Sequence, residues 1–98
     1  MDTDDERARL LDLLRSQHDF PGPYTFKVIY RNQPSAGDAI LAALAELGAG
    51  DVVGEPQLRA SSSARFVSMS LDLTMDTAEQ VLDVYGLLKG LDSVISYF

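Results

Sequence analysis

The residue best placed for binding chemistry is a lysine in the middle of an alternating run. Lys27 stands within Tyr24–Arg31, where apolar and polar residues take turns. Its ammonium group can anchor an anionic ligand or the acidic group of a partner protein. A cross-strand ion pair with Asp72 is the structural alternative, and such pairs contribute only about 0.2–1 kcal/mol. The sequence leaves both roles open.

A run of serines offers a second kind of chemistry. Ser61-Ser62-Ser63 lies between Arg59 and Arg65. Hydroxyls, backbone N–H groups and guanidinium groups together can cradle an anion. The same residues are also typical of a polar hairpin tip, and turn chemistry favours the hairpin.

Catalytic and metal chemistry find little support in the residue types. The chain has no cysteine and a single histidine, His18. His18 precedes the first predicted strand, and no serine or cysteine partner can be assigned to it. Without a nucleophile–base pair or a thiolate cluster, we expect no enzyme activity, no cofactor and no metal site.

Composition narrows the class of protein further. The chain has 98 residues, 46% of them hydrophobic, and its 15 acidic and 8 basic residues give a net charge of −7. This acidity argues against nucleic acid and anionic membrane surfaces, which require many Lys and Arg contacts. No apolar run approaches the roughly 20 residues of a membrane span. Residues 1–6 are acidic where a secretory signal is basic and then apolar, so we expect a cytoplasmic protein.

Four segments have the alternation of β-strands, in which side chains point to opposite faces in turn. The clearest has its apolar residues from Val67 to Leu73 on one face. Pro56 lacks the N–H that a central strand needs, which predicts an edge or bulged strand around it. The last segment is apolar on both faces, so its pattern does not orient it. The predicted strands are Tyr24–Arg31, Val52–Ala60, Arg65–Thr74 and Ser93–Phe98.

Three capping patterns predict helices, because a Ser, Thr or Asp followed three residues later by an acidic residue satisfies free N–H groups. Glycine ends the second and third helices. The patterns are Thr3-Asp4-Asp5-Glu6 for a helix to near Ser16, Ser35 with Asp38 for a helix to Gly48, and Asp76 with Glu79 for a helix to Gly90.

Each predicted helix has an apolar stripe at helical spacing. The leucines of the first helix either pack on their own domain or dock on a partner. The stripes are Leu10, Leu11 and Leu14; Ile40, Ala43, Leu44 and Leu47; and Ala78, Val81, Leu82, Tyr85 and Leu88.

After the leading helix, the element order is βαββαβ, which is typical of ferredoxin-like folds. We therefore predict an α+β sandwich: a four-stranded antiparallel sheet with two helices on one face, plus an N-terminal helix. Residues 1–19 form the helix and linker, and residues 20–98 form the domain. The second face of the sheet stays open. Its predicted residues are Thr25, Lys27, Ile29, Phe66, Ser68, Ser70 and Asp72.

Three parts of residues 17–98 resemble the YbeD-like family, small bacterial proteins also called lipoate-regulatory proteins. The resemblance implies a ferredoxin-like fold related to ACT regulatory domains and a regulatory link to lipoate metabolism, with no catalytic residues to carry over. The family often has Lys-Gly after its serine pair and then a tyrosine, where this chain has Ser63-Ala64 and Phe66. The matching parts are Phe20-Pro21-Gly22-Pro23-Tyr24-Thr25-Phe26-Lys27-Val28, Ser61-Ser62 with Phe66 and Ser68-x-Ser70, and Glu79-Gln80-Val81 with Tyr85, Leu88, Leu91-Asp92 and Val94.

Together these observations predict a non-enzymatic regulatory domain that binds a small-molecule effector or a partner protein. The alternative is a structural adaptor that bridges proteins or self-associates, for example as a homodimer, through its open sheet. The Asn32–Ser35 loop, at a helix N-terminus that favours anions, is a second candidate site. The predicted binding residues are Lys27, Ile29, Phe66, Ser68, Ser70, Ser61, Ser62 and Arg65.

Overall fold

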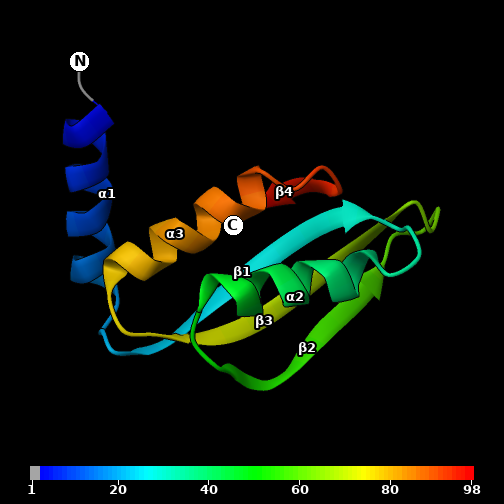
Figure 1. The fold of residues 1–98 in the computed structure, drawn as a ribbon, viewed down its shortest axis with the longest axis horizontal. Helices are drawn as coiled ribbons and strands as arrows, with labels where there is room; N and C mark the ends of the chain where they lie inside the picture. The colour runs from blue at the N-terminus through cyan, green and yellow to red at the C-terminus, as the bar shows by residue number, and fades with distance from the viewer. Residues whose placement is uncertain (1–2) are drawn as a thin grey trace.

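A computed structural model describes residues 3–98 (Figure 1). The predicted α+β, ferredoxin-like βαββαβ arrangement with a leading helix is confirmed. The predicted capping box of the first helix depends on the Thr3 side chain, which lies outside the described part of the chain. The elements are α1 (Thr3–Gln17), β1 (Gly22–Arg31), α2 (Ala36–Leu47), β2 (Val52–Ala60), β3 (Phe66–Met75), α3 (Ala78–Lys89) and β4 (Val94–Tyr97).

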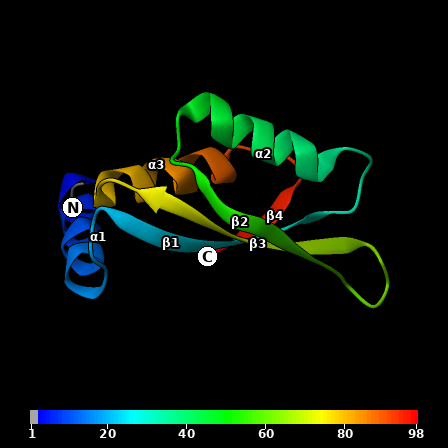
Figure 2. The same ribbon diagram turned by 90° about the horizontal axis from the view of Figure 1, so that it is seen from below.

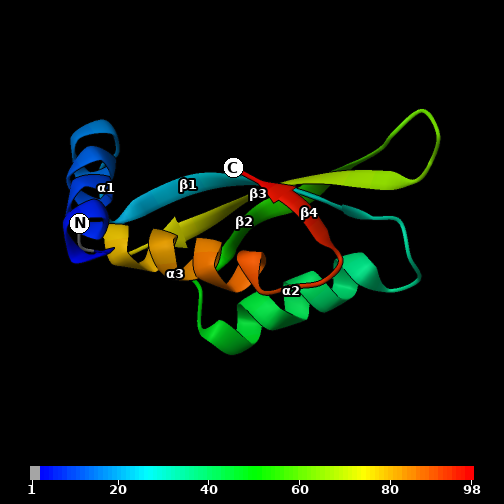
Figure 3. The same cartoon turned by 90° about the horizontal axis from the view of Figure 1, so that it is seen from above.

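The four strands form one antiparallel sheet in the order β2-β3-β1-β4. Phe26 lies opposite Leu71, and Val28 opposite Met69, so the apolar rows of β1 and β3 share one face. Helices α2 and α3 both lie on that face, and the opposite face is uncovered (Figure 2, Figure 3).

The core lies between the sheet and the two helices. Alternation brings every second residue of β1 and β3 to the covered face, where burial of a large apolar side chain stabilises by about 1.5–3 kcal/mol. The prediction that Val67, Met69, Leu71 and Leu73 face the helices is confirmed, with Val67, next to the hairpin, only half-buried. The buried residues include Phe26, Val28, Met69, Leu71, Leu73 and Met75 of the strands and Ile40, Leu44, Val81, Val84 and Leu88 of the helices.

Both outer strands are irregular. The register of β2 against β3 shifts between Val53 and Gln57, around Gly54 (φ 72°) and Pro56. This confirms the edge strand that Pro56 predicts, since an outer strand tolerates a missing N–H.

In the other outer strand, Val94 lies opposite Tyr30 and Ser96 opposite Ile29, so Ile95 is an extra residue. This β-bulge breaks the alternation of β4. Tyr97, opposite Val28, then shares the helix side with Val94. A strand pattern with two apolar faces therefore reflects a bulge rather than burial on both sides.

Two predicted helix caps are wrong in detail. Ser35 has φ 61° and makes no side-chain cap hydrogen bond, because its backbone is left-handed rather than extended. At α3 the capping residue is Thr77, whose hydroxyl accepts a hydrogen bond from the Gln80 N–H at 3.3 Å, rather than Asp76. The Asp76 N–H donates to Gln80 Oε1 at 2.6 Å, so the capping box lies one residue later than predicted.

The predicted apolar stripes also need correction. Leu47 is 43% exposed, because it is the last residue of α2 and the chain turns away at Gly48. In α3, Val84 is buried in the core although the predicted stripe omits it. Leu82 and Tyr85 are only half-buried, because both border a hollow with α1 and the C-terminal residues; Tyr85 also packs against the core.

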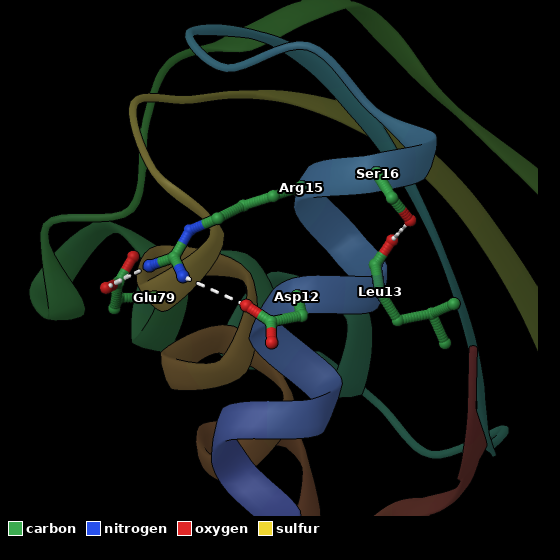
Figure 4. A network of polar contacts seen from close by, with 5 residues as sticks. All are labelled: Asp12, Leu13, Arg15, Ser16 and Glu79. Atoms are coloured by element: carbon green, nitrogen blue, oxygen red, sulfur yellow. Dashed lines mark hydrogen bonds and ion pairs between the residues drawn. The ribbon is translucent and has the colours of Figure 1, made fainter.

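Helix α1 stands at one end of the sheet, beside the start of α3 (Figure 1). Arg15 joins the two helices through an ion pair with Glu79 at 2.7 Å, and it also approaches Asp12 at 3.8 Å (Figure 4). Leu14 packs against the core, whereas Leu13 is 52% exposed. The helix thus rests on the domain through a small contact and leaves the open face of the sheet uncovered.

Deleting residues 1–16 is expected to leave a cooperatively folded domain with a melting temperature several degrees lower. The deletion removes the half-buried Leu11 and Leu14 and the exposed ion pair of Arg15. For a domain of this size, 1 kcal/mol shifts the melting temperature by about 4–8 °C. Thermal unfolding followed by circular dichroism measures this. Arg15→Ala, which removes only the ion pair, should cost less. A gradual, non-cooperative transition of the deletion variant would show instead that α1 belongs to the central core.

Candidate functional site

The uncovered face of the sheet is lined by the residues predicted for it. Alternation places one set of side chains of β1 and β3 away from the helices, and the register fixes which of them are neighbours. The neighbouring pairs are Thr25 with Asp72, Lys27 with Ser70, Ile29 with Ser68, and Arg31 with Phe66.

A shallow pocket of about 420 Å³ lies on this face. Its apolar lining residues include Ile29, Phe66 and Ile95, which belong to three different strands. We call it the open-face pocket. Its lining residues are Lys27, Ile29, Arg59, Ala60, Ser61, Phe66, Val67, Ser68 and Ile95.

Not all of the predicted binding residues line this pocket. Ser70 lies opposite Lys27 on the same face but borders a neighbouring hollow with Gln57 and Asp72. Ser62 and Arg65 lie in the loop that joins β2 to β3, outside the pocket. The structure thus brings Lys27 together with Ile29, Phe66, Ser68 and Ser61 and leaves the other three nearby.

The ion pair considered for Lys27 is not formed. Instead, Thr25 Oγ1 donates a hydrogen bond of 2.5 Å to Asp72 Oδ1, the carboxylate of the residue opposite Thr25 in the sheet. Within residues 3–98, both ion pairs are made by Arg15, on the opposite end of the sheet. The Lys27 ammonium therefore remains available to an anion from outside.

The serine hairpin holds itself together. The Phe66 N–H donates to Ser61 Oγ at 3.2 Å, and the Arg65 N–H donates to Ser63 Oγ at 3.4 Å. The Ser61 N–H donates to the Phe66 carbonyl at 2.8 Å. These contacts are those of a hairpin tip, and they engage N–H groups that an anion cradle would need.

Positive charge collects on this part of the molecule although the chain is acidic. Four of its eight basic residues belong to the open face or the adjoining hairpin. Arg31 also donates to the Asp92 carbonyl at 2.7 Å. Asp72, the acidic residue of this face on β3, is held by Thr25. The four basic residues are Lys27, Arg31, Arg59 and Arg65.

The Asn32–Ser35 loop braces the hairpin. Asn32 Nδ2 donates to the Ala64 carbonyl at 2.8 Å, and the Asn32 N–H donates to the Arg65 carbonyl at the same distance. These bonds join the start of α2 to the hairpin beside the open-face pocket. The loop thus helps to position the pocket edge.

The region around His18 is structural in character. The His18 ring packs 4.7 Å from the ring of Tyr24, and it borders a polar hollow with Asp19 and Glu79. Among residues 3–98, no group of three or more His, Cys, Asp or Glu side chains is placed to hold a metal ion.

Two tyrosines close the core at this end. The hydroxyls of Tyr24 and Tyr85 are 3.1 Å apart, and the Tyr85 ring meets Phe26 edge-on at 5.3 Å. Burial, and then the hydrogen bond with Tyr24, raise the pKa of Tyr85 above its ordinary value. The phenol therefore stays protonated at neutral pH and serves packing rather than base catalysis.

Four residues that line the pocket are absent from the predicted binding set, namely Arg59, Ala60, Val67 and Ile95. Arg59 was assigned only to the serine cluster, because a sequence does not show that it lies beside Ser68 across the β2–β3 register. Ile95 reaches the open face because of the bulge in β4, and no local sequence pattern predicts this bulge. Pairing between distant strands is the signal that local alternation lacks.

The fold and the open-face pocket define a class of protein: a small α+β domain with one uncovered sheet face that is basic and partly apolar. The comparisons give the family. A family model described as "Protein of unknown function (DUF493)" matches residues 15–98. The chain belongs to this family, and its resemblance to YbeD-like proteins is confirmed.

Its relatives are bacterial proteins of about the same length. A UPF0250 protein of Sodalis glossinidius is 33% identical over 88 residues, which covers 90% of this chain and 94% of that protein. A UPF0250 protein of Pasteurella multocida is 32% identical over 88 residues, covering 90% and 93%. Neither has an enzymatic name. Of the helices described here, none has the length and apolar character needed to cross a bilayer.

Proposed function

We propose that this protein is a non-enzymatic regulatory domain that binds an anionic, partly apolar group of a small ligand or partner protein in the open-face pocket. The observation that carries the proposal is the pairing of Lys27 and Arg59 with an exposed apolar surface on a chain of net charge −7. Such a surface attracts negative charge that the rest of the molecule repels.

The pocket offers two kinds of binding energy. Phe66 and Ile95 are 37% and 47% exposed, and covering them removes apolar surface from water at about 25 cal/mol per Å². A charge-assisted hydrogen bond from Lys27 contributes about 1.5–3 kcal/mol when its partner is well placed. Together, these two contributions to the binding free energy are of the size expected for a reversible, regulatory interaction.

The same charges disfavour the adaptor alternative, in which the open face binds a second copy of itself. A two-fold contact brings each surface against its own copy. Lys27 and Arg59 would then lie close to the cations of the other chain, and like charges across an interface cost several kcal/mol. The pocket therefore fits a foreign acidic group better than a copy of itself.

The family resemblance supports a regulatory role connected with lipoate metabolism and supplies the biological setting of the proposal. A chain without cysteine and with a large acidic excess suits the cytoplasm. Both points rest on resemblance and composition, whereas the binding surface rests on the geometry above.

The double variant Lys27→Glu, Phe66→Ser is expected to lose partner and effector binding while it keeps the fold, because neither side chain contributes to the buried core. Circular dichroism checks the fold. Pulldown from bacterial lysate with mass spectrometry, and thermal shift with a panel of small carboxylates, measure binding against the wild type.

The matched control is Lys89→Glu, Leu13→Ser, which makes the same charge change and removes a 52% exposed apolar side chain far from the pocket. The control should bind as the wild type does. If the open-face variant captures the same proteins and shows the same ligand-dependent shift as the control, the open face is not the working surface. The Asn32–Ser35 loop would then be the next candidate.

A further inference from the structure

The outer edge of β2 is open to a further strand. The Ser61 N–H donates to the Phe66 carbonyl, and Arg59 and Gln57 follow it at every second position of the same ladder. In an antiparallel pair, alternate residues bond to the neighbouring strand and the others point away. The N–H and C=O groups of Leu58 and Ala60 therefore point outward, without a strand to accept them.

This edge also has an uncovered leucine. Leu58 lies opposite the buried Met69, on the helix side of the sheet, yet it is 62% exposed. Strand β2 lies to the side of α2 (Figure 1, Figure 2). A hollow of about 500 Å³ is lined by residues of both elements, among them Leu44 and Pro56. Natural edge strands are commonly protected by charge at such a position. Here a leucine occupies that position, and the protective features of β2 are the bulge at Gly54, Pro56, and the charged Glu55 and Arg59 on the opposite side.

We propose that this edge pairs with the β2 strand of a second copy, antiparallel and with the two-fold axis at Leu58. In this register the Leu58 N–H of each chain donates to the Leu58 carbonyl of the other. The Ala60 N–H of each chain donates to the Pro56 carbonyl of the other, and the missing N–H of Pro56 costs only the return bond. The two sheets become one continuous sheet.

The side chains complement one another in the same register. On the helix side, Leu58 covers its copy and Pro56 lies across from Ala60. On the opposite side, Gln57 lies across from Arg59, and Glu55 is a diagonal neighbour of Arg59, within reach of an ion pair. A shift of the axis to Arg59 would bring two arginines together. A shift to Gln57 would place Pro56 against Leu58 and leave the Leu58 carbonyl without a donor.

The paired backbone edge and Leu58 lie outside the open-face pocket, so dimer formation and pocket binding are tested separately, although Arg59 belongs to both surfaces. Pairing through β2 leaves the open face of each chain accessible and brings both pockets to the same side of the joined sheet. Arg59 lies between the pocket and the axis, so each pocket sits next to the interface.

Sedimentation equilibrium of the full chain tests the proposal. The wild type is expected to form a dimer, and Leu58→Arg is expected to raise its dissociation constant at least about tenfold, since each chain loses a buried leucine and gains a like charge at the axis. Leu13→Arg changes a leucine of comparable exposure on α1, 52% against 62% for Leu58, and should leave the dimer intact. A wild type that remains monomeric at all concentrations, as it would if this edge paired only with a foreign strand, overturns the proposal.

A single cysteine tests the register, because the chain has none of its own. Residues opposed in a hydrogen-bonded antiparallel pair have Cα atoms about 5.5 Å apart, within the range a disulfide spans. The Leu58→Cys variant should therefore cross-link on oxidation, and the Leu13→Cys variant should not. Glu55→Arg should weaken the dimer, and Glu55→Arg with Arg59→Glu should restore it. A dimer that tolerates Leu58→Arg and shows no rescue by the charge exchange excludes this interface.

Discussion

Replacing Leu71 by alanine is expected to lower the free energy of unfolding by about 2–5 kcal/mol. Leu71 is 3% exposed and lies opposite Phe26 in the centre of the sheet, so the substitution removes buried surface and leaves a cavity. Ser70→Ala, one residue away on the open face, should cost under about 0.5 kcal/mol. Denaturant unfolding of the two variants gives both values.

The pair of variants tests the sidedness on which the proposed function depends. If Ser70→Ala costs as much as Leu71→Ala, the open face carries part of the core and cannot serve as a free binding surface. If only Leu71→Ala lowers the free energy of unfolding substantially, Lys27 and Ser68 lie on a face whose side chains contribute little to stability. Such a face is available for binding.

The two central strands were predictable because their environment is uniform. From Tyr24 to Tyr30 and from Val67 to Leu73, successive side chains point alternately to the helix-covered face and to the open face of the sheet. The alternation of residue types is then enough to assign each side chain to a face of the sheet. It correctly assigns Lys27, Ile29, Phe66, Ser68 and Ser70 to the open face. Period-2 patterns are reliable where one face is buried and the other is solvated.

The outer strands were harder because their geometry depends on partners far away in the sequence. The extra residue at Ile95 exists only relative to the register of β1. Likewise, Arg59 becomes a pocket residue only through its pairing with Ser68. The capping predictions at Ser35 and Asp76 are wrong for a related reason, because the backbone conformation decides which side chain can cap a helix. Ser35 is left-handed and makes no side-chain cap bond, and Thr77 rather than Asp76 caps α3.

Gly50→Ala is expected to destabilise the protein by about 3 kcal/mol or more, the other large effect that the structure implies. A Cβ at this position would lie 1.6 Å from the Thr74 carbonyl oxygen and 2.7 Å from its carbon. Both atoms belong to the backbone, so they cannot move aside as a flexible side chain does. The neighbouring bond, from the Thr74 N–H to the Asp51 carbonyl at 3.0 Å, would be disturbed as well.

Gly86→Ala is the matched control. Gly86 lies on the exposed side of α3, and a Cβ there meets nothing within 4 Å, so alanine should add about 0.5–1 kcal/mol through helix propensity. Opposite signs for the two glycines, measured by denaturant unfolding, would show that Gly50 is required by the close approach of the α2–β2 connection to the end of β3. Equal effects would mean that this connection can relax. The course of β2, and with it the edge at Leu58, would then be less fixed than the proposed interface requires.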